Sequence, residues 1–289
     1  MRAVKAIVHG AVSILNAIPT GVGGALGVNL RMEAIARLTD DPGRIEARIP
    51  ENEDPGLVIE TAKTVLEYAG KGDLGLFIET RSNIPIGKGL KSSSAASDAV
   101  ALAVAKLIGL DAPPELIVKL AVDASIRAGV TLTGAYDDAY TCFFGGINIV
   151  NNYDRKILLR RNSPSDSPVL ILVPEKKIYT RSVDLEKLSE VRKLCMKAAN
   201  LALKEKFWNA MTLNGLVIAA ALDLDIEPIL SALRAGADAA GVSGTGPAVA
   251  VVASPDKLDE VRKTLERFGK VILCKPNNSQ AYWEVLNRE

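Results

Sequence analysis

The stretch Pro85-Ile-Gly-Lys-Gly-Leu-Lys-Ser-Ser-Ser-Ala95 decides how the rest of this sequence is interpreted. Alternating apolar residues predict a strand over 74–80, just before it, and an alanine-rich pattern predicts a helix over 92–108. Gly87 and Gly89 have no side chain, so the backbone N–H groups of the loop can approach a ligand closely. The stretch is therefore a glycine loop that leads from a strand into a helix.

Charge and polarity at the helix start predict what the loop binds. The serines 92–94 stand where N–H groups lack intrahelical partners and the helix dipole is positive, which is an arrangement that binds phosphate. Lys88 and Lys91 add positive charge, and a serine hydroxyl, assigned to Ser93, can reach a Mg²⁺ ion on the phosphates. The loop thus predicts a triphosphate site.

Two better-known phosphate loops do not fit the spacing. A Walker loop requires G-x-x-x-x-G-K-[ST], but Gly89 follows Lys88, and Ser82 stands where the first glycine should be. A dinucleotide fingerprint requires G-x-G-x-x-G, and Gly21-Val-Gly23 is followed by Leu26 at the third glycine position. The remaining alternative is a helix capped by Ser and Gly with no ligand. The density of Gly, Lys and Ser in one short loop disfavours it.

Composition excludes several classes of protein. With 48% hydrophobic and 24% charged residues in 289, the chain is globular, and its length suggests two domains. A net charge of +1 gives no signature of nucleic-acid binding, and no run of 18 apolar residues predicts a membrane span. Three separated cysteines favour a reducing, cytoplasmic location, and the only histidine, His9, argues against a Ser-His-Asp or Cys-His hydrolase.

Turn-forming residues 162–168 mark a domain boundary, which gives predicted domains of 1–161 and 162–289. The first half mixes strands and helices, and its first strand is expected to run into a glycine loop at Gly10. The second half predicts an α+β domain with helices on one face of a mostly antiparallel sheet. Predicted strands cover 5–9, 28–38, 44–49, 74–80, 147–150, 156–159, 169–173, 248–253 and 271–275, with one more at the end, and predicted helices cover 56–69, 92–108, 113–128, 189–222, 227–236 and 257–268.

Three segments in register resemble the GHMP kinases, the superfamily named for galactokinase, homoserine kinase, mevalonate kinase and phosphomevalonate kinase. The glycine loop resembles the P-x-G-x-G-L-G-S-S-A motif, and 243–252 resembles the C-terminal glycine-rich motif. The stretch 133–146 is similar to the segment that holds the catalytic aspartate ahead of a Gly-Gly pair. The resemblance implies an α+β, two-domain fold, with an N-terminal mixed α/β nucleotide-binding domain and a ferredoxin-like C-terminal domain. It also implies ATP-dependent phosphorylation of a small alcohol.

Departures from the motif indicate one branch of the superfamily. Lys91 replaces the usual glycine and Ser94 the usual alanine, and Gly-Leu-Lys-Ser-Ser-Ser-Ala is typical of the archaeal shikimate kinases, as are 17–25 and 131–139. This resemblance implies shikimate as the acceptor and shikimate 3-phosphate as the product. The alternatives are a GHMP kinase for homoserine, mevalonate or another small alcohol, and a non-catalytic nucleotide sensor of the same fold.

The resemblance also implies which residues form the site. The residues expected to bind ATP are Pro85, Ile86, Gly87, Lys88, Gly89, Leu90, Lys91, Ser92, Ser93, Ser94 and Ala95 of the loop, and Gly244, Thr245 and Gly246 of the second motif. Phosphoryl transfer needs a carboxylate near the attacking hydroxyl, for which Asp137 and Asp138 are the candidates. Asp138 is favoured slightly, and one of the two is expected to cap a helix or lie in a solvated turn.

Shikimate carries a carboxylate, for which arginine is the usual partner. Five arginines are candidates and the sequence does not choose among them: Arg31, Arg81, Arg127, Arg160 and Arg161. Asn16 and Thr20 are weaker candidates for acceptor contacts, and His9 is expected to be a packed residue at a strand end.

Overall fold

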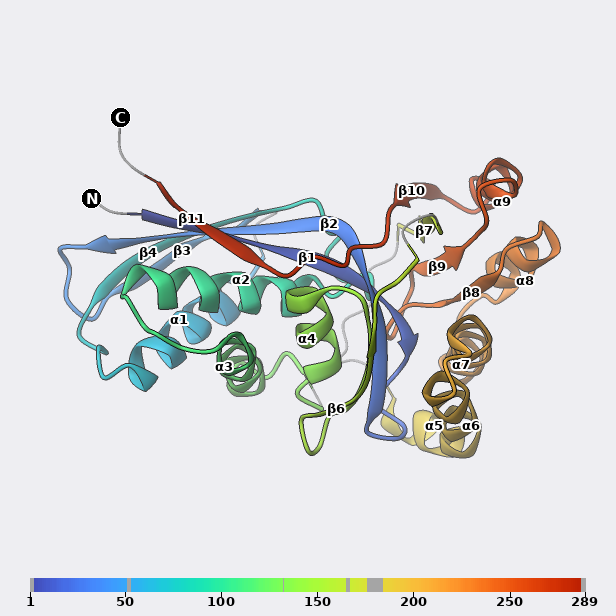
Figure 1. The fold of residues 1–289 in the computed structure, drawn as a ribbon, viewed down its shortest axis with the longest axis horizontal. Coiled ribbons are helices and arrows are strands. Elements are labelled where there is room, and N and C mark those ends of the chain that lie inside the picture. Colours follow the sequence, from blue (N-terminus) through green and yellow to red (C-terminus); the bar gives the residue numbers. More distant parts are fainter. Residues whose placement is uncertain (1–2, 51–52, 132, 165–166, 176–183, 287–289) are drawn as a thin grey trace.

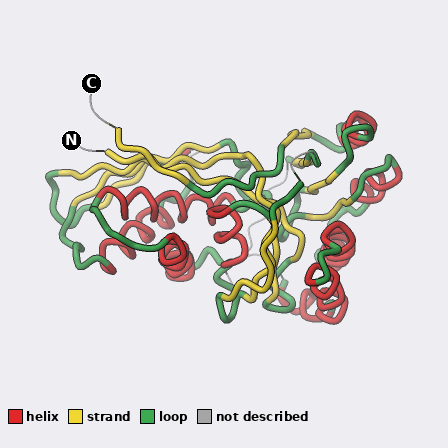
Figure 2. The backbone as a smooth tube through the Cα atoms, in the orientation of Figure 1, coloured by secondary structure: helices red, strands yellow, loops and turns green. Residues whose placement is uncertain are grey.

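A computed structural model describes residues 3–50, 53–131, 133–164, 167–175 and 184–286 of the chain. The described residues form two β-sheets, each with helices packed against it (Figure 1). Figure 2 shows the helices of the two sheets in separate groups, with strands between them. No described helix is long and apolar enough to cross a bilayer.

The first sheet contains most of the N-terminal half. Its strands are β1 (Ala3–Leu15), β2 (Val22–Thr39), β3 (Ile45–Arg48), β4 (Gly75–Ser82), β5 (Ile147–Asn151), β6 (Lys156–Arg161) and β11 (Tyr282–Leu286). The order is β11-β1-β2-β4-β3, and β5 pairs with the start of β2 and with β6. Pairing is antiparallel except between β3 and β4, which are parallel. Because β2 is 18 residues long, one half of it pairs with β4 and the other with β5.

Four helices belong to this sheet: α1 (Gly56–Tyr68), α2 (Ser92–Leu107), α3 (Pro114–Arg127) and α4 (Tyr136–Phe144). Figure 1 shows α1, α2 and α3 on one face of the sheet, with α4 beside β5 and β6. Alanine and valine fill most of the buried positions of α2, and these small side chains let it pack closely on β1 and β2. Pro114 occupies the first turn of α3, as predicted, because its fixed φ suits a helix start.

The second sheet has the strand order of a ferredoxin-like domain. Its strands are β7 (Val169–Val173), β8 (Ala239–Val242), β9 (Val249–Val252) and β10 (Lys270–Cys274). They are antiparallel in the order β10-β7-β9-β8. The helices of this half are α5 (Leu185–Glu190), α6 (Arg192–Leu203), α7 (Phe207–Ala221), α8 (Glu227–Arg234) and α9 (Leu258–Leu265). The expected α+β fold class is confirmed.

Several predicted elements differ from the structure. The first strand does not end at Gly10: β1 continues to Leu15, with a shift of register between His9 and Gly10. The helical stretch predicted over 189–222 contains the end of α5 and the whole of α6 and α7, and β8 was not predicted, because its four residues are too few to show a strand period.

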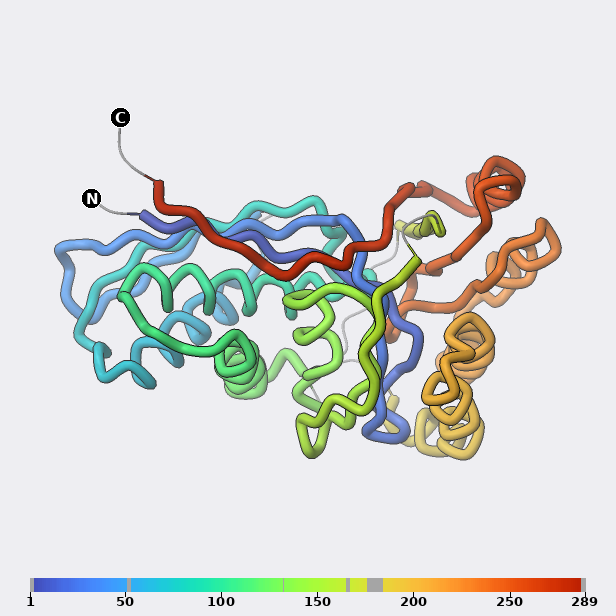
Figure 3. Tube along the Cα trace, viewed as in Figure 1, coloured from blue at the N-terminus to red at the C-terminus, as the bar shows by residue number. Residues whose placement is uncertain are grey.

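The last strand also lies elsewhere than the sequence pattern suggests. The pattern places it in the second sheet, but β11 pairs with β1, so that Ala3 lies opposite Leu286. The two ends of the chain therefore run side by side, as Figure 3 shows. The boundary between 161 and 162 stays a prediction, and residues 165–166 of the predicted linker lie outside the described residues.

β1 joins the two halves of the molecule. It contacts α2 on the N-terminal side and α7 and β8 on the C-terminal side, and all but one of its residues are buried. Helix α7 approaches β8 very closely at Gly215, where a Cβ would overlap the backbone of Gly241 and lie 2.8 Å from the Val242 nitrogen. This close approach fixes the position of Asn214, whose Oδ1 accepts a hydrogen bond from the Asn16 N–H at the end of β1.

We expect Gly215→Ala to destabilise the protein, because the added methyl group must separate α7 from β8. The overlap outweighs the ~1 kcal/mol by which alanine favours a helix, and the free energy of unfolding should fall by about 2 kcal/mol. Gly72→Ala is the matched control, because nothing lies within 4 Å of the added Cβ. Urea unfolding of both variants measures the difference. Equal stability of the two would show that the contact does not constrain the packing.

Candidate active site

A cavity of about 450 Å³ lies where the glycine loop, α4 and the C-terminal glycine-rich segment meet. This volume is within the range of about 300–1,000 Å³ of small-molecule sites. Residues 15–18 at the end of β1 line it, as do parts of 49–60, 86–96, 122–139 and 244–245. The cavity is thus built from segments far apart in the sequence, and both halves of the chain contribute.

The glycine loop presents the N-terminus of α2 to this cavity. Helix α2 begins at Ser92, and no side chain among the described residues caps it. Ser92, Ser93 and Ser94 all line the cavity. Since the first N–H groups of a helix have no intrahelical partner, they are available to an anion in the cavity. The predicted helix start is confirmed.

Contacts with the C-terminal glycine-rich segment fix the loop from behind. The Ser243 hydroxyl donates a hydrogen bond of 2.7 Å to the Gly89 carbonyl and accepts one of 3.0 Å from the Ser13 N–H. Gly89 has a φ of 77°, and a Cβ there would overlap the Ser243 carbonyl oxygen. Glycine is therefore required at 89 for the approach of the two loops, which is a different reason from the ligand approach expected from the sequence.

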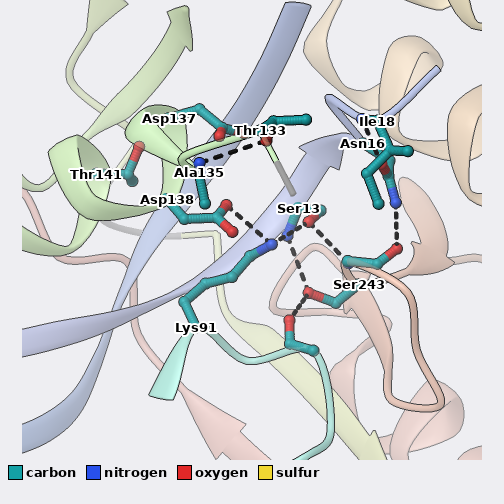
Figure 4. Close-up of polar contacts among 12 residues, drawn as sticks. Ser13, Asn16, Ile18, Lys91, Thr133, Ala135, Asp137, Asp138, Thr141 and Ser243 are labelled. Atoms are coloured by element: carbon teal, nitrogen blue, oxygen red, sulfur yellow. Dashed lines mark hydrogen bonds and ion pairs between the residues drawn. The ribbon is translucent and has the colours of Figure 1, made fainter. Parts of the chain in front are cut away.

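Lys91 and Asp138 form an ion pair inside the cavity. The Lys91 Nζ lies 2.9 Å from Asp138 Oδ1 and donates a hydrogen bond of 2.7 Å to the Ser13 hydroxyl. The same hydroxyl accepts a hydrogen bond of 2.8 Å from the Gly244 N–H. Figure 4 shows the ammonium between Asp138 and Ser13. Three segments, 89–91, 136–138 and 243–244, thus meet around the end of β1.

The two aspartates have different environments. Asp137 is 3% exposed, its N–H donates to Asn152 Oδ1, and a Cβ on Gly23 would overlap its carboxylate. Burial, followed by the charge of Asp138, raises the pKa of Asp137 to about 7. Asp138 is less buried and faces Lys91. The expectation that one of the two caps a helix or lies in a solvated turn is wrong, because Ala135 is the N-cap of α4 and neither carboxylate is exposed.

The charges around Lys91 keep its ammonium protonated. Burial lowers the pKa of Lys91, but the carboxylates of Asp138 and Asp137 and the contact with Asp138 together raise it above its ordinary value. The group is therefore a permanent cation at neutral pH, with two acidic side chains beside it.

Most residues predicted to bind ATP line the cavity. Those that do are Ile86, Gly87, Gly89, Leu90, Lys91, Ser92, Ser93, Ser94, Gly244 and Thr245, and those that do not are Pro85, Lys88, Ala95 and Gly246. The Lys88 side chain is buried, and its ammonium donates to the carbonyl groups of Pro174 and Glu175. Lys88 therefore ties the loop to the end of β7, which differs from the predicted contact with phosphate.

None of the five candidate arginines lines the cavity among the described residues. Arg127 pairs with Glu67, and Arg161 pairs with Glu205. Arg160 lies over the Phe144 ring, Arg31 lies opposite His9 in the first sheet, and Arg81 is exposed on β4. The expectation that one of them faces the acceptor is not met in the described cavity.

Two of the remaining candidates are structural. His9 is buried in β1 away from the cavity, as expected, and burial followed by the charge of Arg31 lowers its pKa. The Thr20 hydroxyl bonds with the backbone of Val22, and Thr20 does not line the cavity. Asn16 does line it, and its side chain holds the loop by donating to the Gly244 carbonyl.

Sequence reasoning missed several residues that shape the site. Ser13 accepts from Lys91 and Gly244, Asn152 fixes the Asp137 backbone, and Asn214 holds Asn16. Of these three residues, only Ser13 could have been singled out from the sequence, because it is a polar residue in an otherwise apolar stretch.

Comparison with known proteins places the chain in a family. The GHMP kinases N terminal domain matches residues 56–146, and the GHMP kinases C terminal domain matches residues 196–271. A protein of Pyrococcus furiosus named shikimate kinase is 38% identical over 91% of this chain and 95% of its own length. Another of that name from Methanosarcina acetivorans is 39% identical over 96% and 95%. The chain belongs to the GHMP kinases. It is therefore an ATP-dependent kinase, as the sequence resemblance implied.

Solved structures agree with the fold of this GHMP kinase. Homoserine kinase from Cytophaga hutchinsonii superposes with a TM-score of 0.76 at 20% identity and covers 98% of this chain and 97% of its own. The mevalonate kinase of Methanococcus jannaschii gives 0.75 at 19% identity, covering 95% and 98%. These likenesses confirm the two-domain fold and carry no information on the acceptor.

The residues of the cavity suit a nucleoside triphosphate. The uncapped start of α2, two glycines of positive φ in the loop and the serine hydroxyls provide donors for phosphate oxygens. Ser93 is exposed at the first turn of α2, where its hydroxyl can contribute an oxygen ligand to Mg²⁺. The donor set therefore fits Mg-ATP.

We expect Gly89→Ala to weaken ATP binding, because the added Cβ pushes the glycine loop away from Ser243. Gly109→Ala is the matched control, since Gly109 has a similar φ of 71° but nothing within 4 Å of its Cβ. Both variants carry a backbone strain of about 1–2 kcal/mol. Only Gly89→Ala should lose a further 1–3 kcal/mol to overlap and bind ATP more weakly, which urea unfolding and titration calorimetry measure. Equal losses of stability and of ATP affinity in the two variants would contradict the steric role of Gly89.

Proposed function

We propose that this kinase transfers the γ-phosphoryl group of ATP to shikimate and so forms ADP and shikimate 3-phosphate, in the chorismate pathway to aromatic amino acids. The observation that carries the proposal is that proteins named shikimate kinase are 36–39% identical to this chain over nearly its whole length. The cavity supports it, because the start of α2 and the Asp138 carboxylate face the same space. A cytoplasmic location is part of the proposal.

Asp138 is the catalytic base of the proposed reaction. A carboxylate near the acceptor hydroxyl accepts its proton as the oxygen attacks the phosphorus. Both aspartates line the cavity, but Asp138 is the less buried of the two, and its carboxylate is held by the Lys91 ammonium. The Asp137 carboxylate is packed against Gly23, and burial, followed by the charge of Asp138, raises its pKa to about 7. The choice of Asp138 rests on its greater exposure to the cavity and on its contact with Lys91.

The phosphates are held by the start of α2 in this proposal. The N–H groups of Ser92, Ser93 and Ser94 would donate to phosphate oxygens, and the Ser93 hydroxyl would supply a ligand to Mg²⁺. The remaining residues of the predicted ATP site that line the cavity shape it around the nucleotide. When bound, Mg²⁺ neutralises charge on the transferring phosphoryl group.

The acceptor is expected to meet neutral donors. Thr131 and Thr133 line the cavity with the two aspartates. Ser125 and Asn16 line it as well, although their side chains already donate to the Ala121 and Gly244 carbonyl groups. Hydroxyl and amide groups can bind the carboxylate and hydroxyl groups of shikimate through several hydrogen bonds. This assignment replaces the arginine expected from the sequence.

The acceptor is tested with a panel of small alcohols. With saturating Mg-ATP, we expect kcat/KM for shikimate to exceed those for homoserine and mevalonate by at least about tenfold, which corresponds to ~1.4 kcal/mol in the transition state. Coupled release of ADP measures turnover. A preference for homoserine or mevalonate would contradict the assignment of shikimate and leave the kinase intact, whereas ATP binding without turnover of any alcohol would indicate a nucleotide sensor.

The two aspartates are separated by paired amide variants. Asp138→Asn keeps the shape of the side chain but removes the basic site, so kcat should fall by about 10²–10⁴-fold with little change in ATP affinity. Asp137→Asn is the matched variant on the adjacent residue, and it should keep kcat within about tenfold of the wild type. Steady-state kinetics and ATP titration measure both. The reverse result would move the base to Asp137.

A further inference from the structure

Lys91 occupies an unfavourable backbone position. Its φ of 67° and ψ of 26° lie in the left-handed region, where an L side chain is strained and glycine is at ease. The GHMP motif has glycine at this position, and here a lysine stands in its place. A strained residue with a large side chain persists where its contacts offset the strain, so the contacts of the ammonium indicate its role.

The ammonium of Lys91 is held on two sides by the protein. Asp138 Oδ1 lies 2.9 Å from it, and the Ser13 hydroxyl accepts its hydrogen bond at 2.7 Å. The side chain is 6% exposed. The Ser13 hydroxyl is itself fixed by the Gly244 N–H at 2.8 Å, so the ammonium has a rigid support. Figure 4 shows the side chain reaching from the glycine loop across to α4.

The charges around Lys91 are acidic. The titratable groups that face it are Asp138, Asp137 and Cys142, all on α4. A cation that neutralises a carboxylate at 2.9 Å has less charge to offer a phosphate than the free lysine expected from the sequence. Removing the ammonium would leave the Asp138 carboxylate without its counter-ion in a poorly solvated site.

We propose that Lys91 is a positioning residue that acts through Asp138: its ammonium, anchored on Ser13, holds the Asp138 carboxylate in one orientation, and it is not a ligand of the nucleotide phosphates. The inference rests on the proposed function in that Asp138 is the base. The inference gives a reason for the departure from the GHMP motif at position 91: lysine replaces glycine there because its ammonium supports the carboxylate that accepts the proton. It also explains why a strained lysine stands at the junction of the glycine loop and α2.

A double-mutant cycle tests the inference. Wild type, Lys91→Met, Asp138→Asn and the double variant are compared for kcat with shikimate, KM for Mg-ATP and ATP affinity by calorimetry. Lys91→Met should lower kcat by about 10²-fold, as expected when a catalytic group is misplaced, with KM and affinity for Mg-ATP within about threefold of the wild type. In the Asp138→Asn background the same change should cost no more than about threefold, because residues that act as a unit are not additive.

Two further substitutions separate positioning from a merely structural role. Lys91→Gly relieves the strained backbone but removes the ammonium, so kcat should stay as low as in Lys91→Met although the protein is at least as stable. Lys91→Arg keeps a cation and should recover more activity than either. Recovery of activity by Lys91→Gly would overturn the inference, because it would show that only the backbone matters.

Failure of the inference is distinct from failure of the proposed function. A loss of ATP affinity above about tenfold in Lys91→Met with near-normal kcat at saturation would make Lys91 a phosphate ligand and overturn the inference. Additive losses of kcat in the cycle would overturn it as well. If the wild type prefers another alcohol, the cycle is run with that acceptor. If it turns over none, the proposed function fails and the inference fails with it, because Asp138 is then not a base; failure of the inference alone is the case in which the wild type turns over an alcohol and the cycle is additive or ATP affinity is lost.

Discussion

The meeting of two glycine-rich loops at the end of β1 is the constraint on which the cavity depends. The 86–91 loop and the 243–246 segment come from different halves of the chain, and they approach so closely that a Cβ on Gly89 would overlap the Ser243 carbonyl oxygen. Ser13 of β1 lies between them, donates its N–H to Ser243 and accepts from Gly244 and Lys91. Because these partners are buried, each lost bond would leave an unpaired polar group, and the arrangement is therefore specific.

The same constraint divides the cavity into two chemical regions. The start of α2 presents N–H groups and serine hydroxyls, which suit phosphate oxygens. The start of α4 presents two carboxylates, of which Asp138 is paired with Lys91 and Asp137 is buried against Gly23. Adjacent carboxyl groups in different environments tend to take different protonation states. The Lys91 ammonium beside Asp138 offsets part of the repulsion between that carboxylate and a phosphoryl donor in the same cavity.

Several interactions that the sequence assigned to ligands are used by the protein itself. Lys88 binds the carbonyl groups at the end of β7, Asn16 binds the Gly244 carbonyl, and Lys91 binds Asp138. Each is a contact between segments distant in the chain, and the partners are separated by 86, 228 and 47 residues respectively. A local sequence pattern shows which side chains are charged or can form hydrogen bonds, but it does not show which distant group each of them will contact. For this reason the motif could not say which of its charged side chains would contact other segments of the protein.

The sequence by itself determined the glycine loop, the start of α2, most of the other helices and the family, because these depend on residues close together in the chain. Turn residues, the helical period of apolar residues and the serines at the start of α2 act on their neighbours within a few residues. The elements that they form can therefore be predicted from short stretches of sequence. The tertiary structure alone decided that β11 returns to β1, that no described arginine faces the cavity, and that Asp138 rather than Asp137 meets Lys91. Strand pairing and the choice between adjacent carboxylates depend on which segments pack together and on burial, which no local pattern encodes.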